Sequence, residues 1–410
     1  MKFLLVVPPL TGHVTPLRAV AAELAWRGHR VAWCGPEPAT SHLTRTYPVY
    51  AAGDSGPFAV ELRPGGLRGF AALKYLWESY LIPLADEMLP GVRAAIDRFK
   101  PDVVVTDQQA LAGALAATTA GVRWVTSAST PAGLADPATG MPKITAWIRQ
   151  LQHDLCARHG SAPHDLRFSP HLVLAFTIPE LAGSVNTLRG TTGHFAGAPA
   201  TQPSTVDFPW TALDDRPLVV VTLGTSNAPA GKRFLAESVH ALSRMDHFQG
   251  VVVDPTGELE SGKVLLAPVV PLPELLTRAA VTVCHGGHNT VCESLAAGVP
   301  LVIAPIRDDQ SMLAQRVAEN GAGIRLRFDR TTADDLQHAI TSVLTDPGYA
   351  AQAARLQHSL GVAGGARTAV TLLESLNRKP RERHNHAAGR GAGSGSTGDV
   401  ESRTPHVGGL

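Results

Sequence analysis

The sequence predicts an α/β protein made of two Rossmann-like parallel-sheet domains, and two observations support this fold class. Short apolar runs alternate with stretches of helical pattern, and a strand, a helix and a second strand follow one another within about 30 residues. This order favours a parallel sheet with a right-handed crossover. The same alternation starts again near residue 217, so we expect two domains that face each other across a cleft.

The first half opens with the elements of this unit. Residues 2–7 are an apolar run that ends in a loop of proline and glycine, and residues 30–33 form the second strand. Between them we expect a helix that Thr15 caps, with Pro16 as its first residue and Gly28 at its end. Two further strands and the helix between them are expected at 102–106, 124–126 and 110–119.

The chain divides at a segment of low periodicity that is rich in proline, threonine and aspartate. We expect residues 1–200 to form the first domain, 201–216 a linker, 217–376 the second domain and 377–410 a disordered tail. The strands of the second domain are expected at 218–223, 251–253, 264–266, 281–284, 301–304 and 324–328. Ligands of such sheets bind at the carboxyl ends of the strands.

Composition and charge disfavour several classes of protein. The 410 residues carry a net charge of +1, which gives no reason to expect nucleic acid as a partner. The apolar windows are too short for a membrane span, so we expect no stable membrane insertion. The four cysteines have neither the paired spacing of metal ligands nor the density of a disulfide framework. We therefore expect a cytoplasmic protein with free thiols and no metal site.

Clustered aromatic residues interrupt the α/β rhythm between 50 and 100 and again between 131 and 167. They are Phe58, Phe70, Tyr75, Trp77, Tyr80 and Trp147. Packing between helices accounts for most residues of this kind, and an apolar wall for a small acceptor is the alternative.

Residues 281–300 carry the strongest sign of a ligand site. An apolar strand ends at His285, and Gly286 and Gly287 then form a turn that opens a helix. Glycine allows a ligand to approach the main chain closely, and the first turn of a helix offers unpaired N–H groups to an anion. A diphosphate fits such a site, with His285 and the hydroxyl of Thr290 as further donors.

Glu293 allows two interpretations. Thr290 and Glu293 have the spacing of a capping box, in which each side chain binds a backbone N–H of the other residue. The alternative is contact with the ligand, because Glu293 lies one turn beyond Asn289 and Thr290 on the same helix face.

The same segment resembles the donor signature of inverting glycosyltransferases with the GT-B fold, which include plant and bacterial small-molecule glucosyltransferases. That signature is His-x-Gly-x-Asn-(Ser/Thr)-x-x-Glu, followed sixteen residues later by Asp-Gln. It occurs here from His285 to Glu293 and then at Asp309 and Gln310. The resemblance extends over most of residues 1–375.

The resemblance implies a role for each matching residue. The diphosphate would be held by His285, Gly287, Asn289 and Thr290. Glu293 would bind the ribose hydroxyls, and Asp309 and Gln310 would bind hydroxyls of the transferred sugar. An intact Asp-Gln pair is more typical of members that use glucose than of those that use deoxysugars, so UDP-glucose is the first choice of donor.

Two upstream segments match the family less completely. Thr225 and Ser226 follow the first strand of the second domain, as do phosphate-contacting residues of the family, and an ordinary strand and turn is the alternative. The family often has Trp-x-Pro-Gln before the donor helix, but residues 269–272 read Val-Val-Pro-Leu. The backbone of Val270 would then be left to pair with the base, so uracil, thymine or another base remains open.

His13 and Asp107 follow two strands of the first predicted sheet, at the end where functional groups collect. A near-neutral imidazole suits proton removal, and a carboxylate orients it and stabilises its protonated form. The alternatives are a structural loop histidine and a helix N-cap by Asp107. Gly12, His13 and Pro16 resemble the family's Gly-His-x-x-Pro loop, whose histidine is the catalytic base paired with an aspartate.

The resemblance thus implies an inverting transfer of a hexose to a small apolar acceptor such as a polyketide or a phenolic compound. We expect a monomer or homodimer that needs no metal and no cofactor beyond the nucleotide sugar. Two alternatives remain, a non-catalytic homologue that activates a partner transferase and a sugar-nucleotide epimerase of the same fold. The sequence determines neither the acceptor nor whether its O, N or C atom is attacked.

Overall fold

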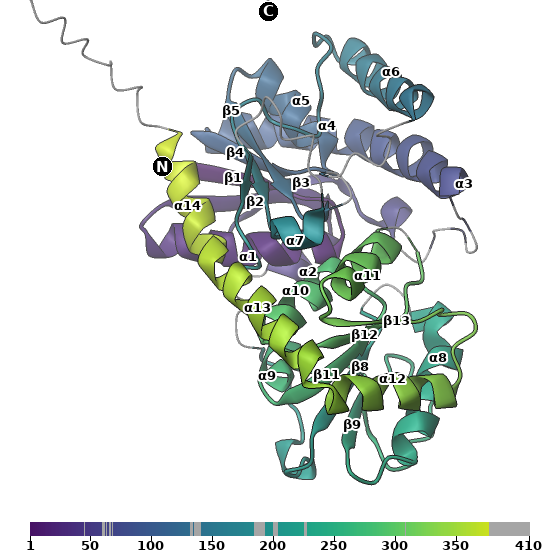
Figure 1. Ribbon diagram of the computed structural model, residues 1–410. Helices are drawn as coiled ribbons and strands as arrows, with labels where there is room; N and C mark the ends of the chain where they lie inside the picture. Colours follow the sequence, from purple (N-terminus) through teal and green to yellow (C-terminus); the bar gives the residue numbers. More distant parts are fainter. Residues whose placement is uncertain are drawn as a thin grey trace, which may run out of the picture.

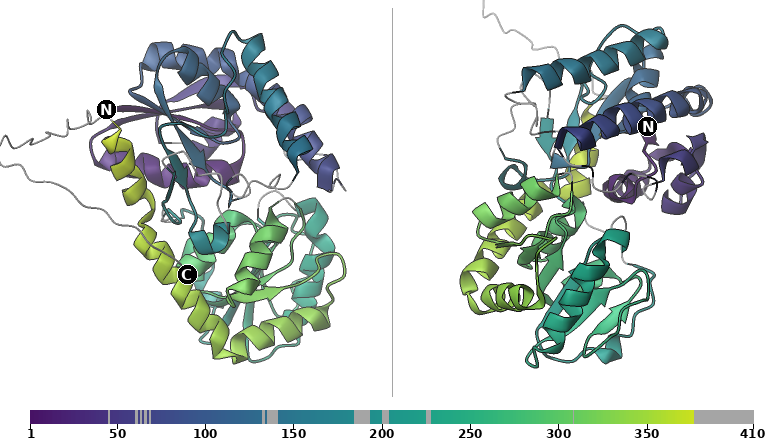
Figure 2. Two further views of the ribbon diagram at one scale, coloured as in Figure 1. Left: turned by 45° about the horizontal axis from the view of Figure 1, so that its top comes forward. Right: turned by 90° about the vertical axis from the view of Figure 1, so that its right-hand side faces the viewer.

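The computed structural model describes most of the chain up to residue 376. The described residues are 1–376 without 45, 60, 61, 63, 65, 66, 68, 132, 133, 135–140, 184–192, 200–203, 225–227 and 308. The expected tail, residues 377–410, lies outside them. Figures 1 and 2 show two α/β domains, one above the other, which confirms the predicted fold class.

A parallel sheet forms the centre of the first domain. In the described residues it has the strand order β3-β2-β1-β4-β5-β6-β7. Its strands are β1 (Lys2–Val6), β2 (Arg30–Glu37), β3 (Val49–Asp54), β4 (Val103–Asp107), β5 (Arg123–Ala128), β6 (Val173–Ala175) and β7 (Gly193–Phe195). Its helical segments are α1 (Thr11–Trp26), α2 (Ala39–Thr44), η1 (Gly56–Phe58), α3 (Gly69–Lys74), η3 (Tyr75–Leu81), α4 (Ile82–Phe99), α5 (Leu111–Thr119), α6 (Pro142–Arg158) and α7 (Pro179–Ala182).

Both faces of this sheet are covered, which explains the continuous apolar runs of its strands. Leu4 and Val6 pack on one face with residues of α4 and α5. Phe3 and Leu5 point to the opposite face and pack with residues of α1. Alternate residues of one strand therefore enter two separate core layers.

The second domain repeats this architecture with the strand order β10-β9-β8-β11-β12-β13 in the described residues. Its strands are β8 (Leu218–Thr222), β9 (Gln249–Val253), β10 (Leu265–Ala267), β11 (Ala279–Cys284), β12 (Leu301–Ile303) and β13 (Gly323–Arg325). Its helical segments are η5 (Trp210–Ala212), α8 (Ala228–Ser243), α9 (Leu272–Leu276), α10 (His288–Ala296), α11 (Gln310–Glu319), α12 (Ala333–Thr345) and α13 (Pro347–Ala363). Each strand that the sequence predicts in this half is present, with ends that differ by a few residues.

Two helices pack against the domain to which they do not belong by chain order. Figure 1 shows α14 (Gly365–Ser375) continuing upwards from α13 to the first domain, where it packs against α1. Ala369, Val370 and Leu373 enter the same apolar cluster as Phe3. Residue Leu181 of α7 joins the core of the second domain in return. The range 217–376 that we expect to form the second domain thus includes a helix that is anchored on the first.

The start of α1 differs from the prediction. The helix begins at Thr11, with Leu10 in the N-cap position, so Pro16 lies inside it rather than at its first residue. The hydroxyl of Thr15 donates to the carbonyl oxygen of Thr11, 2.9 Å away, and caps nothing. His13 therefore lies in the first turn of α1, so its backbone is fixed by the helix and does not belong to a loop.

None of the helices in the described part of the chain is long and apolar enough to cross a membrane.

Candidate active site

A buried cluster of three polar side chains lies where β1, β4 and β5 end. Nδ1 of His13 is 2.8 Å from Oδ1 of Asp107. The hydroxyl oxygen of Ser129, just beyond β5, is 2.6 Å from Oδ2 of Asp107 and 2.7 Å from Nδ1 of His13. The sheet places β4 between β1 and β5, so that the three residues meet. The structure therefore brings the predicted pair together and adds Ser129, which the sequence analysis missed.

The partners of His13 assign its tautomer. A carboxylate only accepts hydrogen bonds, so Nδ1 carries the proton and donates to Asp107, while Nε2 keeps its lone pair. Burial lowers the pKa of His13, but the charge and hydrogen bond of Asp107 and the charge of Asp309 raise it above its ordinary 6.5 overall. This arrangement suits a base that a carboxylate orients and stabilises.

Asp107 does not cap a helix, which removes the alternative interpretation. Helix α5 begins at Leu111, and its N-cap residue is Ala110. Asp107 is the last residue of β4, and its Oδ1 accepts from the backbone N–H of Gln109, 2.9 Å away. Both oxygens of this fully buried carboxylate thus have donors.

The turn between β11 and α10 requires its two glycines. Gly286 has a φ of +84°, and a Cβ atom there would lie 2.9 Å from Cγ2 of Ile303. A Cβ atom on Gly287 would lie 2.4 Å from Nε2 of His285. Gly287 is the N-cap residue of α10 and brings no capping side chain, so the first turn keeps its N–H groups for an anion.

The capping box does not form. Thr290 is the third residue of α10, inside the helix, whereas a capping box needs it before the first residue. Glu293 is half-buried in the next turn. The interpretation of Glu293 as a capping residue is therefore wrong, which favours a role in binding a ligand.

His285 is neutral at the end of β11. Burial is the main cause that lowers its pKa to about 4, and the charge of Arg307 adds to this effect while the backbone of Thr222 opposes it. Its Nδ1 is buried and has no hydrogen-bond partner among the described residues. A Cβ atom on Gly224 would lie 3.0 Å from the His285 ring. The imidazole therefore fits between Gly224 and Gly287 because neither residue has a side chain.

The predicted sugar contacts, Asp309 and Gln310, lie at the start of α11. Oε1 of Gln310 accepts from the backbone N–H groups of Ile306 and Arg307, each 2.9 Å away. Gln310 therefore holds this backbone in shape, whatever it binds. Asp309, at the N-cap position of α11, is close enough to His13 to raise its pKa.

Asn289 links the donor turn to the first domain. Its Nδ2 donates to the carbonyl oxygen of Gly12, 2.9 Å away, in the turn before His13. The predicted donor residues and the predicted base thus lie on adjoining surfaces of the two domains.

The remaining predicted residues receive less support. Thr225 and Ser226 lie outside the described residues. Val270 packs on an apolar cluster beside β10, and its carbonyl oxygen accepts from the N–H of Leu272, 2.9 Å away. The structure thus leaves the pairing of Val270 with a base untested.

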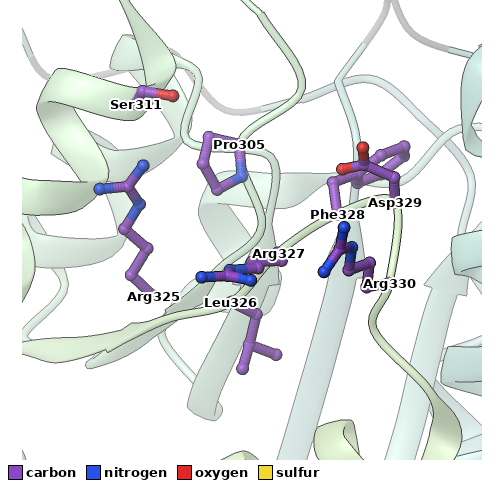
Figure 3. Close-up of a pocket in the computed structure, with 8 residues that line it drawn as sticks. All are labelled: Pro305, Ser311, Arg325, Leu326, Arg327, Phe328, Asp329 and Arg330. Atoms are coloured by element: carbon purple, nitrogen blue, oxygen red, sulfur yellow. The ribbon is translucent and has the colours of Figure 1, made fainter.

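A cavity of about 550 Å³ adjoins the start of α11. Its lining consists of Pro305, Ser311, Arg325, Leu326, Arg327, Phe328, Asp329 and Arg330. Figure 3 shows the three arginines of this lining, one at the end of β13 and two in the segment that follows. They place positive charge beside the start of α11, where Asp309 and Gln310 lie.

The aromatic residues divide between the two interpretations. Phe58 and Trp77 are buried in the core of the first domain, as packing predicts. Phe70 is 55% exposed and lies against Trp147, with ring centroids 5.5 Å apart. The contact of Phe70 with Trp147 therefore offers an apolar surface that a ligand could reach.

Among the described residues, no group of three or more histidine, cysteine, aspartate or glutamate side chains is placed to hold a metal ion.

The comparisons with known proteins give results that are consistent with one another. Residues 251–365 match the family described as "Erythromycin biosynthesis protein CIII-like, C-terminal domain". The chain is 28% identical to 4'-demethylrebeccamycin synthase of Lentzea aerocolonigenes, over 92% of this chain and 99% of that protein. It is 27% identical to zeaxanthin glucosyltransferase of Pseudescherichia vulneris, over 91% and 97% of the two chains.

Solved structures show the same fold. The glycosyltransferase VinC, in complex with dTDP, superposes with a TM-score of 0.75 at 20% identity, over 92% of this chain and all of that one. The spinosyn rhamnosyltransferase SpnG, complexed with thymidine diphosphate, has a TM-score of 0.72 at 22% identity, over 91% of this chain and all of its own. These likenesses confirm the GT-B fold.

Proposed function

Because the chain is a glycosyltransferase of the secondary-metabolite type, we propose that it transfers a hexose, with glucose as the first choice, from a nucleoside diphosphate to a small apolar acceptor. The transfer inverts the anomeric carbon, with His13 as the general base. One observation carries the proposal, namely the buried contact of His13, Asp107 and Ser129 next to the glycine turn that opens α10.

The geometry supports a single displacement. Nε2 of His13 takes the proton of the acceptor while the acceptor atom forms its bond to the anomeric carbon. The bond from that carbon to the diphosphate oxygen breaks, and the diphosphate leaves with the electron pair. The uncapped first turn of α10 lies where it stabilises the negative charge of the leaving group.

Each part of the donor is assigned to its own residues. We assign the diphosphate to Gly287, Asn289, Thr290 and the neutral ring of His285, and the ribose to Glu293. We assign the sugar to Asp309 and Gln310, and the effect of the charge of Asp309 on the pKa of His13 supports a position of the anomeric carbon near the base. Val270 is assigned to the base, which is uracil as first choice and thymine as the alternative.

The acceptor class and the setting are part of the proposal. An apolar natural product is supported by the relatives, which are named for rebeccamycin and zeaxanthin, and by the exposed Phe70, whose ring lies against Trp147. We place the enzyme in the cytoplasm, as a monomer or homodimer that works without a metal.

The first test replaces the base. His13→Ala is expected to lower kcat by about 10²- to 10⁴-fold, because a general base contributes that much, while the affinity for UDP stays within about threefold. Mass spectrometry with a panel of nucleotide sugars and acceptors measures transfer, and calorimetry measures UDP binding. Full activity of the variant would contradict the mechanism.

A second test separates the enzyme from a non-catalytic activator and from an epimerase. An activator would bind a partner transferase and give no product alone, and an epimerase would change the sugar nucleotide without an acceptor. Formation of a glycosylated acceptor by the purified chain excludes both.

A further inference from the structure

His288 is a buried histidine at the junction of the two domains, and the proposed reaction gives it no role. It is the first residue of α10 and is 7% exposed. Its neighbour Asn289 donates to the carbonyl oxygen of Gly12, which lies one residue before the base His13. Figure 1 shows α10 beneath α1, and the two helices are in contact. His288 therefore stands where the donor helix meets the turn that bears the base.

The neighbours of the ring indicate its protonation. Nε2 of His288 is 3.4 Å from Sγ of Cys292, one turn further along α10. Burial raises the pKa of Cys292 to about 12, so the thiol keeps its proton and can donate it to Nε2. Burial, and then the charge of His13, lower the pKa of His288 to about 4, while the backbone of Ser129 opposes them. The ring is neutral, and a thiol that donates to Nε2 leaves the proton of the ring on Nδ1.

This Nδ1–H group has no hydrogen-bond partner among the described residues, although it is buried. A buried donor without an acceptor is unfavourable, and native proteins leave few of them. The backbone of Ser129 raises the pKa of His288, as a carbonyl oxygen does when it faces an imidazole N–H. The hydroxyl of the same Ser129 contacts His13 and Asp107.

We propose that His288 is a positioning residue whose Nδ1–H donates to the carbonyl oxygen of Ser129 in the donor-bound enzyme. The bond fixes Ser129 and thereby holds its hydroxyl against His13 and Asp107. Helix α10 carries His288 together with Asn289 and Thr290, to which we assign the diphosphate, so the bond couples the donor to the base. This inference rests on the proposed function, because it concerns the same site.

Three variants distinguish the two nitrogens of the ring. The amide of His288→Asn presents an N–H near the position of Nδ1, whereas His288→Gln presents one near Nε2 and His288→Phe presents none. We expect His288→Gln and His288→Phe to lower kcat about tenfold, with a change in donor KM below about threefold, and His288→Asn to restore most of kcat. If the ring of His288 contributed only packing, His288→Phe would keep more of the wild-type kcat than His288→Asn.

The pH profile supplies a second readout. The hydroxyl oxygen of Ser129 lies 2.7 Å from Nδ1 of His13 and can accept from its N–H group. A loosened Ser129 removes this acceptor, which favours the protonated ring, so the pKa of His13 falls. The acid limb of kcat/KM is therefore expected at lower pH in His288→Gln and His288→Phe than in the wild type, and close to the wild type in His288→Asn.

An exposed histidine of α13 provides the matched control, because His358→Gln makes the same chemical change on the surface of the protein. Its kcat and pH profile should equal those of the wild type. If the kcat and pH profile of His288→Gln and His288→Phe also equal those of the wild type, and the wild type binds UDP and transfers sugar, this inference is wrong and the proposed function stands. A wild type that binds no UDP, measured by calorimetry, would instead refute the proposed function.

Discussion

Three histidines of the site differ in pKa because their neighbours differ. Burial lowers the pKa of His285 and of His288 to about 4, so that both are neutral. Burial acts on His13 in the same direction, but the carboxylate of Asp107 outweighs it and raises the pKa. A carboxylate partner thus separates the base from two histidines of similar burial.

The pH dependence of catalysis tests this difference. His13 acts as a base only when deprotonated, so kcat/KM should rise with pH through the raised pKa of His13. Asp107→Asn removes the charge that raises this pKa, and the acid limb should move to lower pH. The variant should also lose about 10²- to 10⁴-fold in kcat, because the orienting carboxylate is gone.

Rate measurements between pH 5 and 9 with a fixed donor check both effects. An acid limb that stays in place would show that Asp107 does not control the protonation of His13.

Gly287 tests the close packing of the donor turn. A methyl group on Gly287 would meet Nε2 of His285 at 2.4 Å, so Gly287→Ala should displace the imidazole and weaken UDP binding at least about tenfold. The control is Gly361→Ala in α13, where an added Cβ atom has nothing within 4 Å. Calorimetry should find wild-type affinity for the control, and equal affinity of both variants would rule out the packing argument.

At the scale of elements, α14 brings residues late in the described chain into contact with residues near its start. It follows α13 of the second domain and packs on the same face of the first sheet as α1. Arg27 and His29, near the end of α1, bind the carboxylate of Glu374 at 3.0 and 2.8 Å. The first domain is therefore complete only when α14 packs against it.

The stability of the first domain should depend on this helix. Leu373 is fully buried in the cluster that α1 and α14 share, so Leu373→Ala should lower the free energy of unfolding by about 2–5 kcal/mol. Val362 of α13 is 73% exposed, and Val362→Ala should change the free energy of unfolding by less than about 0.5 kcal/mol. Urea denaturation followed by fluorescence compares the two, and equal midpoints would show that α14 is not part of the core.

At the scale of the whole molecule, the two domains meet both at the proposed site and away from it. The bond from Asn289 to Gly12 joins them at the donor turn. Asn320 of the second domain donates to the carbonyl oxygen of Glu180, 3.2 Å away, on the side of α7. A nucleotide held by the second domain therefore lies beside the surface of the first.

Binding of UDP should stabilise the full chain. At about 100 times its Kd, a ligand that binds only the folded protein adds about 2.7 kcal/mol to the free energy of unfolding. Differential scanning calorimetry should show a higher Tm with UDP, and because we propose a metal-independent enzyme, EDTA should reduce neither this shift nor the rate of transfer. Loss of the shift in EDTA would contradict metal independence.

The sequence by itself determined the two sheets, the donor turn and the pair of His13 and Asp107, because these depend on local patterns. Apolar runs mark buried parallel strands, and glycines before a helix mark an anion site. It did not reveal β3, β6 and β7, which are short or have mixed burial, nor the true start of α1.

Only the tertiary structure decided what distant segments do together. Ser129 and His288 carry no local sign of function, although Ser129 follows a strand and the carboxyl-end rule could have marked it. Their roles arise because β5 adjoins β4 and because α10 meets α1 across the domains. The return of α14 is equally non-local, since an amphipathic helix shows that it has a buried face but not which surface buries it.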